Sequence, residues 1–205
     1  MEFALETMET TECYRLLTRL VAPRPIAFVS SLDAAGRGNL APFSFFMLGG
    51  AAPPSVVICP LGDRRRGDKD TLRNIESTGE YVIHVVTEAM VARVNQASFD
   101  YPPEVDEFDA AGFTRVPSVR VRPPRVAESP VAMECRRFQV VRHGSGPMAS
   151  NYIIGEVVHV HVDDAVLTDG LPDTHLIQPA ARLGANDWSI TRAAMHFSLA
   201  RPTAP

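Results

Sequence analysis

The chain is poor in cysteine and in long apolar runs, and each shortage excludes a class of protein. Its three cysteines, Cys13, Cys59 and Cys135, are odd in number, far apart and without a CxxC pair. This spacing offers neither a disulfide framework nor a zinc site and is typical of reduced thiols. No apolar run approaches the roughly 18 residues that a membrane span needs. Residues 1–12 carry four glutamates and no basic residue, the opposite of a secretory signal, so we expect a cytoplasmic protein.

Basic residues are also in deficit. The 205 residues include 20 of Lys and Arg against 24 of Asp and Glu, which gives a net charge of −4. An acidic total argues against a nucleic-acid partner, although a local basic patch would survive it. Only one of the 20 basic residues, Lys69, is a lysine. Either the coding sequence favours arginine and Lys69 is a leftover, or a compact ammonium is needed at this place, as in a phosphate contact.

The familiar motifs of catalytic and nucleotide-binding sites are missing. The sequence has no GxGxxG after a predicted strand, no Walker lysine loop, no GxSxG elbow and no HExxH pair. His159 and His161 leave a predicted strand on the same face, but no third ligand has a fitting spacing, so we expect no metal site. Arg64, Arg65 and Arg66 form either a nucleic-acid patch or a solvated loop near an anionic cofactor, and the acidic total favours the loop.

The sequence does contain many strand patterns. Hydrophobic periodicity and turn residues predict strands at 26–32, 55–59, 81–87, 131–141 and 152–162, and helices at 10–21, 70–77 and 88–97. The absence of β-α-β alternation favours a closed antiparallel barrel over a doubly wound sheet. We expect a single domain over residues 1–205. Within it, residues 98–130 form an extended loop region with little periodicity, which is typical of a functional lid or a partner contact.

Three segments, at 24–31, 39–46 and 69–75, carry polar side chains that are ordinary one by one. Each alone is explained by a strand end or a helix cap. Together they contain the groups that bind flavin mononucleotide (FMN). Its flat ring binds between apolar walls that carry small hydroxyls, and its phosphate binds a cation, hydroxyls and a helix N-terminus. The residues that fit the ring are Phe43, Ser44 and Phe45, and those that fit the phosphate are Ser30, Ser31, Lys69 and Thr71.

In this order, the three segments resemble the flavin reductase-like, FMN-binding split-barrel family. The resemblance covers roughly residues 10–190 and includes further pieces at 99–108, 128–131, 134–135, 155–158 and 182–184. It implies a mainly β fold, a six-stranded antiparallel Greek-key split barrel with short peripheral helices. It also implies a homodimer with the flavin near the subunit interface, and two-electron reduction of flavin by a nicotinamide.

The resemblance further implies which residues bind FMN. Matching residue by residue gives Arg24, Ser30, Ser31, Asn39, Ala41, Ser44 and Phe45 for the flavin-contacting stretches, and Lys69, Asp70 and Thr71 for the phosphate end. His84 stands where relatives often have Asn, and Trp188 occupies a common Tyr position, so both bear on the substrate more than on flavin binding. The flavin performs the hydride exchange, so no acid or base is required, and His84 and His143 are the only candidates for that role.

We therefore expect an oxidoreductase that uses NAD(P)H to reduce noncovalently bound FMN, with a monooxygenase as one candidate partner. Two alternatives stay open: an FMN-dependent enzyme with its own small organic substrate under the 98–130 loop, and a non-catalytic flavin-binding electron carrier. The four aromatic rings of that loop need a surface to cover, and we expect the flavin face or the partner subunit to provide it. These rings are Phe99, Tyr101, Phe108 and Phe113.

Overall fold

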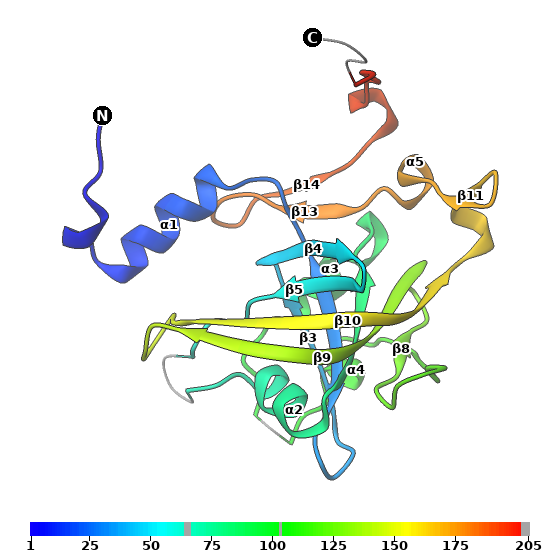
Figure 1. The fold of residues 1–205 in the computed structure, drawn as a ribbon, viewed down its shortest axis with the longest axis horizontal. Helices are drawn as coiled ribbons and strands as arrows, with labels where there is room; N and C mark the ends of the chain where they lie inside the picture. Colours follow the sequence, from blue (N-terminus) through cyan, green and yellow to red (C-terminus); the bar gives the residue numbers. More distant parts are fainter. Residues whose placement is uncertain (64–66, 103, 202–205) are drawn as a thin grey trace.

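The centre of the protein is one antiparallel sheet of seven strands (Figure 1). The computed structural model describes residues 1–63, 67–102 and 104–201, so the predicted loop at Arg64, Arg65 and Arg66 lies outside the described residues. Across the sheet the strands are β3 (Gly38–Phe43), β2 (Ala27–Leu32), β6 (Glu80–Val85), β9 (Val131–His143), β10 (Ser150–Val162), β5 (Pro54–Ile58) and β4 (Phe46–Ala51).

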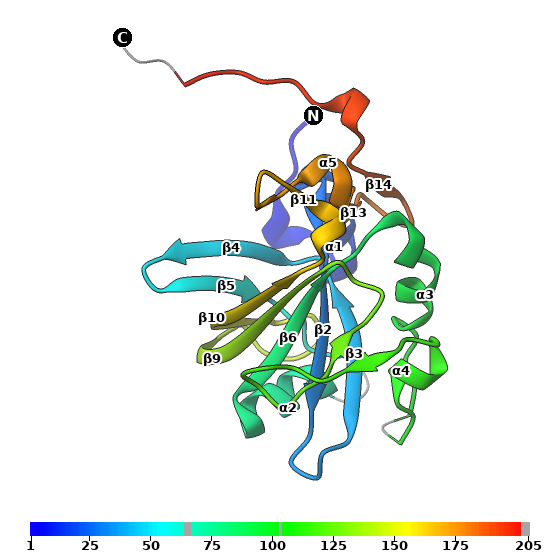
Figure 2. The same ribbon diagram turned by 90° about the vertical axis from the view of Figure 1, so that its right-hand side faces the viewer.

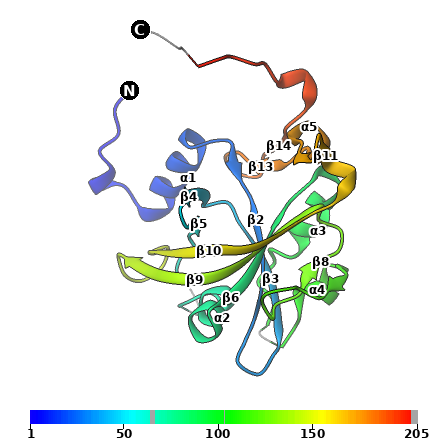
Figure 3. The same cartoon turned by 45° about the vertical axis from the view of Figure 1, so that its right-hand side comes forward.

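The sheet is strongly twisted. Figure 2 shows β4, β5, β9 and β10 fanned away from β2 and β3, and the hairpin of β9 and β10 runs across the molecule in Figure 3. The predicted mainly β, antiparallel architecture is confirmed, with seven strands in the main sheet where the resemblance implied six. The two strands missing from the sequence prediction, β3 and β4, are the edges of the sheet, where residues such as Pro42 are tolerated.

The core lies on both faces of β2. Ala27 and Val29 point to one cluster of buried side chains and Phe28 points to the other, as strand geometry requires. Helix α2 (Asp70–Thr78) closes the first cluster with Leu72 and Ile75, both fully buried. The second cluster is closed on the other side by α3 (Val91–Gln96) and α4 (Glu107–Ala110), which Figure 2 shows beside β3.

Short elements complete the molecule. They are α1 (Thr10–Leu20) and α5 (Thr174–Ile177), the 3₁₀ turns η1 (Leu5–Thr7), η2 (Glu88–Met90), η3 (Asp164–Val166) and η4 (Ala193–Met195), a small sheet of β1 (Arg24–Pro25), β13 (Ala180–Arg182) and β14 (Trp188–Ile190), and the pairs β7 (Arg115–Val116) with β8 (Arg125–Val126) and β11 (Leu167–Thr168) with β12 (Leu171–Pro172). Among the described residues, no helix has the length and apolarity to cross a membrane.

The segment 98–130 is part of the core, which corrects one expectation for it. Phe108 and Phe113 are buried in the cluster that contains Phe28, so two of its four rings are covered by the protein's own core. Only Phe99 and Tyr101, which contact each other edge to face, lie outside that cluster. The sequence showed little periodicity here because α4 has four residues and β7 and β8 have two each.

Side chains of the main sheet hold this segment by its backbone. The fully buried carboxylate of Glu134 on β9 accepts the main-chain N–H groups of Val119 at 2.8 Å and Arg120 at 2.6 Å. On β2, the Ser30 hydroxyl donates to the Pro124 carbonyl at 2.6 Å. Hydrogen bonds to a buried carboxylate are among the stronger ones in proteins, so we regard 98–130 as a fixed wall.

Gly155 on β10 leaves space for the ring of the fully buried Tyr81. A Cβ at position 155 would lie 1.9 Å from the Tyr81 hydroxyl oxygen and 2.8 Å from ring atom Cζ. We expect Gly155→Ala to lower the free energy of unfolding by about 1–3 kcal/mol, measured in urea, because overpacking a filled core displaces side chains. Tyr81→Phe removes the closest atom, so adding it should recover part of the loss. A Gly155→Ala protein as stable as the wild type would contradict this packing.

Candidate functional site

A cavity of about 770 Å³ lies where α1, the β3–β4 connection and the start of α2 meet. This volume falls within the range of about 300–1,000 Å³ that small-molecule sites occupy. Its apolar lining includes Pro42, Phe43, Phe45, Leu61 and Met148, its hydroxyls are Thr11, Tyr14 and Ser44, and its charged residues are Arg15, Arg19, Asp63, Lys69 and Asp100. The walls thus combine aromatic surface with cations, as the sequence predicted for a flavin nucleotide.

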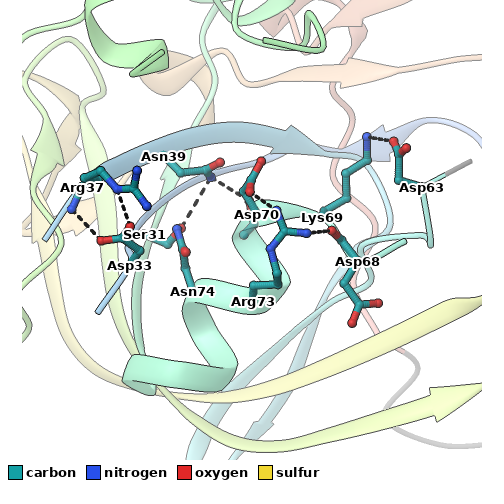
Figure 4. Close-up of polar contacts among 11 residues, drawn as sticks. Ser31, Asp33, Arg37, Asn39, Asp63, Asp68, Lys69, Asp70, Arg73 and Asn74 are labelled. Atoms are coloured by element: carbon teal, nitrogen blue, oxygen red, sulfur yellow. Dashed lines mark hydrogen bonds and ion pairs between the residues drawn. The ribbon is translucent and has the colours of Figure 1, made fainter. Parts of the chain in front are cut away.

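Lys69 lines this cavity at the N-terminus of α2. It directly precedes the helix, its side chain is 43% exposed, and its ammonium pairs with the Asp63 carboxylate at 2.7 Å. Figure 4 shows the extended Lys69 side chain reaching Asp63. The side chain of the N-cap residue Lys69 makes no capping hydrogen bond to α2. The main-chain N–H groups of the first turn lie at the positive end of the helix dipole. A cation and a helix N-terminus together favour an anion here.

A buried hydrogen-bond network fixes α2 against β2 and β3 (Figure 4). The Asn39 amide donates to the Thr71 hydroxyl at 2.8 Å and to the Ser31 hydroxyl at 3.5 Å. The Asn74 amide donates to the same Ser31 hydroxyl at 3.2 Å. All four side chains are buried. The structure therefore brings the predicted residues Ser31, Asn39 and Thr71 together, but their polar groups bind one another and set the position of α2.

Two predicted residues of the β2–β3 pair lie apart from this network. Ser30 follows Val29 on the strand and points to the opposite face from Ser31, where its hydroxyl bonds the Pro124 carbonyl. Ala41 pairs with Val29 in the β2–β3 ladder, on the same face as the network. Alternation along a strand separates the two adjacent serines, which the resemblance alone had grouped.

The other predicted residues lie on either side of the α2 N-terminus. Ser44 and Phe45 line the 770 Å³ cavity directly. Asp70 is the first residue of α2, forms an ion pair with Arg73, and lines a separate cavity of about 50 Å³ together with Asn39. A carboxylate in the first turn stabilises the helix through its dipole, which is the role the geometry gives to Asp70.

Arg24 is buried under the end of α1. Its guanidinium donates to the carbonyls of Val21 at 2.8 Å and Leu183 at 2.9 Å, to the Thr18 carbonyl, and to the Ser44 hydroxyl at 3.4 Å. Burial lowers the pKa of this guanidinium. Arg24 thus joins α1, the loop before β14 and the β3–β4 connection, and so positions the cavity wall.

Sequence analysis missed the residues that α1 and the loop after β5 contribute. Tyr14 of α1 lies over the cavity with its ring centroid 6.2 Å from that of Phe45. Gly62 approaches the 144–149 turn so closely that a Cβ would lie 2.6 Å from the Gly146 carbonyl oxygen. In the sequence, the pair Gly144 and Gly146 predicts only a turn and does not indicate this contact. The helical periodicity of residues 10–21 likewise predicted a helix without indicating which side chains reach a site.

The two histidines considered as acid or base lie elsewhere. His84 is fully buried, its Nδ1–H donates to the Phe28 carbonyl at 2.8 Å, and its Nε2 accepts the Val126 N–H at 2.9 Å. Burial lowers its pKa to about 4, so His84 is a neutral structural link. His143 is exposed at the end of β9 and lines neither cavity described above. Within the described ranges, no group of three or more His, Cys, Asp and Glu side chains is placed to hold a metal ion.

Comparison with known proteins identifies the fold. The model of the flavin reductase like domain matches residues 19–175. The chain belongs to the flavin reductase-like family. Among solved structures, this family member is similar to nitrilotriacetate monooxygenase component B of Bacillus cereus, with 29% identity, a TM-score of 0.91 and coverage of 97% of this chain and 98% of that chain.

Two further structures extend the comparison. The 2-nitrobenzoate 2-nitroreductase of Pseudomonas fluorescens has 29% identity, a TM-score of 0.87 and coverage of 99% of this chain and 97% of that chain. Flavoredoxin of Desulfovibrio vulgaris has 25% identity, a TM-score of 0.76 and coverage of 100% and 98%. The predicted family and split-barrel fold are confirmed, and membership supports a flavin-related oxidoreductase. The aromatic wall, the hydroxyl of Ser44 and the cation at α2 also fit a flavin nucleotide.

The buried imidazole of His84 predicts a pH-dependent stability. Below its usual pKa of about 6.5 the unfolded chain protonates this group, whereas the folded chain stays neutral until the pH nears 4. The free energy of unfolding should therefore fall as the pH drops, by about 2 kcal/mol between pH 7.5 and 5 from this residue. Urea unfolding at both pH values should show a smaller fall for His84→Asn. Equal falls in the two proteins would contradict the assignment.

Proposed function

We propose that the protein binds FMN noncovalently in the cavity of about 770 Å³ and uses NAD(P)H to reduce it. One observation carries the proposal: a single cavity joins an aromatic wall at Phe45 to the only lysine of the chain, at a helix N-terminus. Apolar walls with a few convergent polar groups are typical of cofactor sites. With its phosphate at the N-terminus of α2, the flavin would place its ring in the part of the cavity that is lined by aromatic side chains.

The chain's residues divide into those that would contact FMN and those that position them. Phe45 and Tyr14, which contact each other, would line one side of the ring site, and Ser44 would bond the edge of the ring. Lys69 and the first N–H groups of α2 would hold the phosphate. Arg24, Ser31, Asn39 and Thr71 keep these groups in place through the buried bonds described above, and Ser30 and Asp70 support the scaffold. When bound, FMN supplies the two-electron chemistry, and the protein orients the electron donor and the acceptor.

The three similar structures support different uses of a reduced flavin. One is named as a monooxygenase component, one as a nitroreductase and one as a flavoredoxin. A monooxygenase partner would receive reduced flavin from this protein, a nitroreductase-like enzyme would reduce its own organic substrate, and a carrier would pass electrons to another protein. We favour NAD(P)H-dependent flavin reduction, with reduction of a bound organic substrate as the second candidate because an inner cavity adjoins the first.

The visible spectrum of the purified protein, recorded without oxygen before and after NADH and NADPH, tests this function. We expect flavin absorbance that one or both nucleotides bleach, and steady nucleotide oxidation when excess FMN is added. Bleaching only by a reduced protein would identify a carrier. A protein that neither retains nor takes up flavin would contradict the proposal.

Lys69→Ala should weaken FMN binding and leave riboflavin binding nearly unchanged, because riboflavin lacks the phosphate. The lost charge-assisted contact is worth about 1.5–3 kcal/mol, or about ten- to a hundredfold in the FMN dissociation constant. Quenching of flavin fluorescence measures both constants. Arg192→Ala, which removes an exposed cation that pairs with Glu88, serves as the control. An equal loss for FMN and riboflavin would contradict the phosphate assignment.

We also propose that the protein is a homodimer. An apolar stripe crosses the outer face of β4, β5, β10 and β9: Met47 pairs with Val57, Val57 with Ile154, and Tyr152 with Val141. Met47, Tyr152 and Val141 are exposed. Exposed apolar patches of this kind mark interaction sites, and a symmetric dimer covers the same patch on both subunits.

Light scattering with FMN present should report twice the chain mass of 22.4 kDa. Met47→Asp places a charge in the stripe and should shift the protein toward the monomer. Leu171→Asp, at a 71% exposed apolar residue on β12, should leave the mass unchanged. A wild-type mass of 22.4 kDa would contradict the dimer.

A further inference from the structure

A second, inner cavity of about 300 Å³ adjoins the proposed flavin cavity. The two cavities share five residues in their walls: Tyr14, Arg15, Pro42, Ser44 and Ala185. The inner cavity is otherwise formed by residues far apart in the sequence, including residues of α1, β1, α3, β13 and β14. A molecule held there would lie directly beside whatever occupies the larger cavity.

Three arginines line the inner cavity. They are Arg15, Arg24 and Arg182, and none of the described residues in its lining is an aspartate or glutamate. The ion pairs among the described residues include neither Arg15 nor Arg182. Burial lowers the pKa of the Arg24 guanidinium most strongly, Tyr14 opposes this effect, and the charge of Arg182 lowers the pKa by a smaller amount. Like charges gathered without a counterion favour the binding of an anion.

The three arginines differ in how many of their guanidinium N–H groups already donate to acceptors within the protein. The guanidinium of Arg24 donates to the carbonyls of Thr18, Val21 and Leu183 and to the Ser44 hydroxyl. Among the described residues, Arg182 donates to one acceptor, the Ala185 carbonyl. Arg15 on α1 is exposed at the cavity wall. Arg15 and Arg182 are therefore the side chains that can donate to a bound anion.

The remaining lining is apolar and partly flat. The Trp188 ring lies under the Arg182 guanidinium, with 4.8 Å between the guanidinium carbon and the ring centroid. Ile26 and Val94 lie behind this side of the cavity and are themselves buried. A ligand that suits these walls has a flat apolar body as well as a negative group.

We propose that the inner cavity binds a small aromatic carboxylate, with its carboxylate on Arg15 and Arg182 and its ring against Trp188. About 300 Å³ lies at the lower limit for small-molecule sites, so it suits one ring with its acid group and not a dinucleotide. Guanidinium groups bind carboxylates through paired N–H bonds. This proposal rests on the proposed function in one respect: the bound acid would lie next to the flavin only if FMN occupies the larger cavity.

Benzoate and its neutral analogue benzamide test the proposal on the FMN-loaded protein by calorimetry. Trp188 is the only tryptophan of the chain, so its fluorescence reports binding in this cavity independently. We expect benzoate to bind at least tenfold more tightly than benzamide and to change the Trp188 emission. Arg182→Gln and Arg15→Gln should each weaken benzoate about tenfold, and Arg182→Lys should lose less because it keeps the charge. Arg192→Gln should stay within twofold of the wild type.

Any of these results would overturn the proposal: equal affinities for benzoate and benzamide, wild-type affinity in both glutamine variants, or no saturation by benzoate at millimolar concentration. Tighter binding of inorganic phosphate than of benzoate would also overturn it, because the site would then recognise phosphate. The titrations are repeated on flavin-free protein. Benzoate binding there, with no uptake of FMN, would refute the proposed function and support the inner site.

Discussion

Asn39 is a buried amide at the junction of β3 with α2, and the geometry of the candidate site depends on its hydrogen bonds. Its nitrogen reaches Thr71 at 2.8 Å, and Asn74 and Asn39 share the Ser31 hydroxyl. A buried polar group left without a partner costs about 1–3 kcal/mol, so any shift of α2 that broke these bonds would be opposed by that amount for each group. Because α2 is fixed in this way, its N-terminus and Lys69 stay at the edge of the cavity.

The same device acts on the other face of β2. Ser30, His84 and Glu134 are fully buried, and each bonds a main-chain group of the 98–130 segment. A segment with little regular structure has many backbone groups to satisfy, and buried side chains of the sheet satisfy them here. This explains why polar residues occupy the interior of strands that are otherwise apolar. It also leaves the segment a rigid wall, with Asp100 reaching the larger cavity and Ser98 the inner one.

Sequence periodicity predicted the regular elements well and the site only in part. The spacing of apolar residues located α1, α2 and the five inner strands of the main sheet within a few residues. Strands β3 and β4 were not predicted because Pro42 and Gly49 are poor strand formers, which edge positions tolerate. The resemblance named Ser31, Asn39 and Thr71 as FMN-binding residues, and the structure adds that their side chains also bond one another and Asn74, which no sequence pattern indicated. No short sequence pattern indicated the inner cavity, since its arginines are far apart in the chain and are brought together only by the packing of α1 on β1 and β13.

We propose that the network around Asn39 presents the N-terminus of α2 and Lys69 to a phosphate. A crystal structure of the FMN complex tests it most directly. We expect phosphate oxygens within hydrogen-bond distance of the Lys69 ammonium and of main-chain N–H groups in the first turn of α2, with the Asn39–Thr71 bond intact. A phosphate bound instead beside Arg15 and Arg19, at the opposite wall of the cavity, would contradict it.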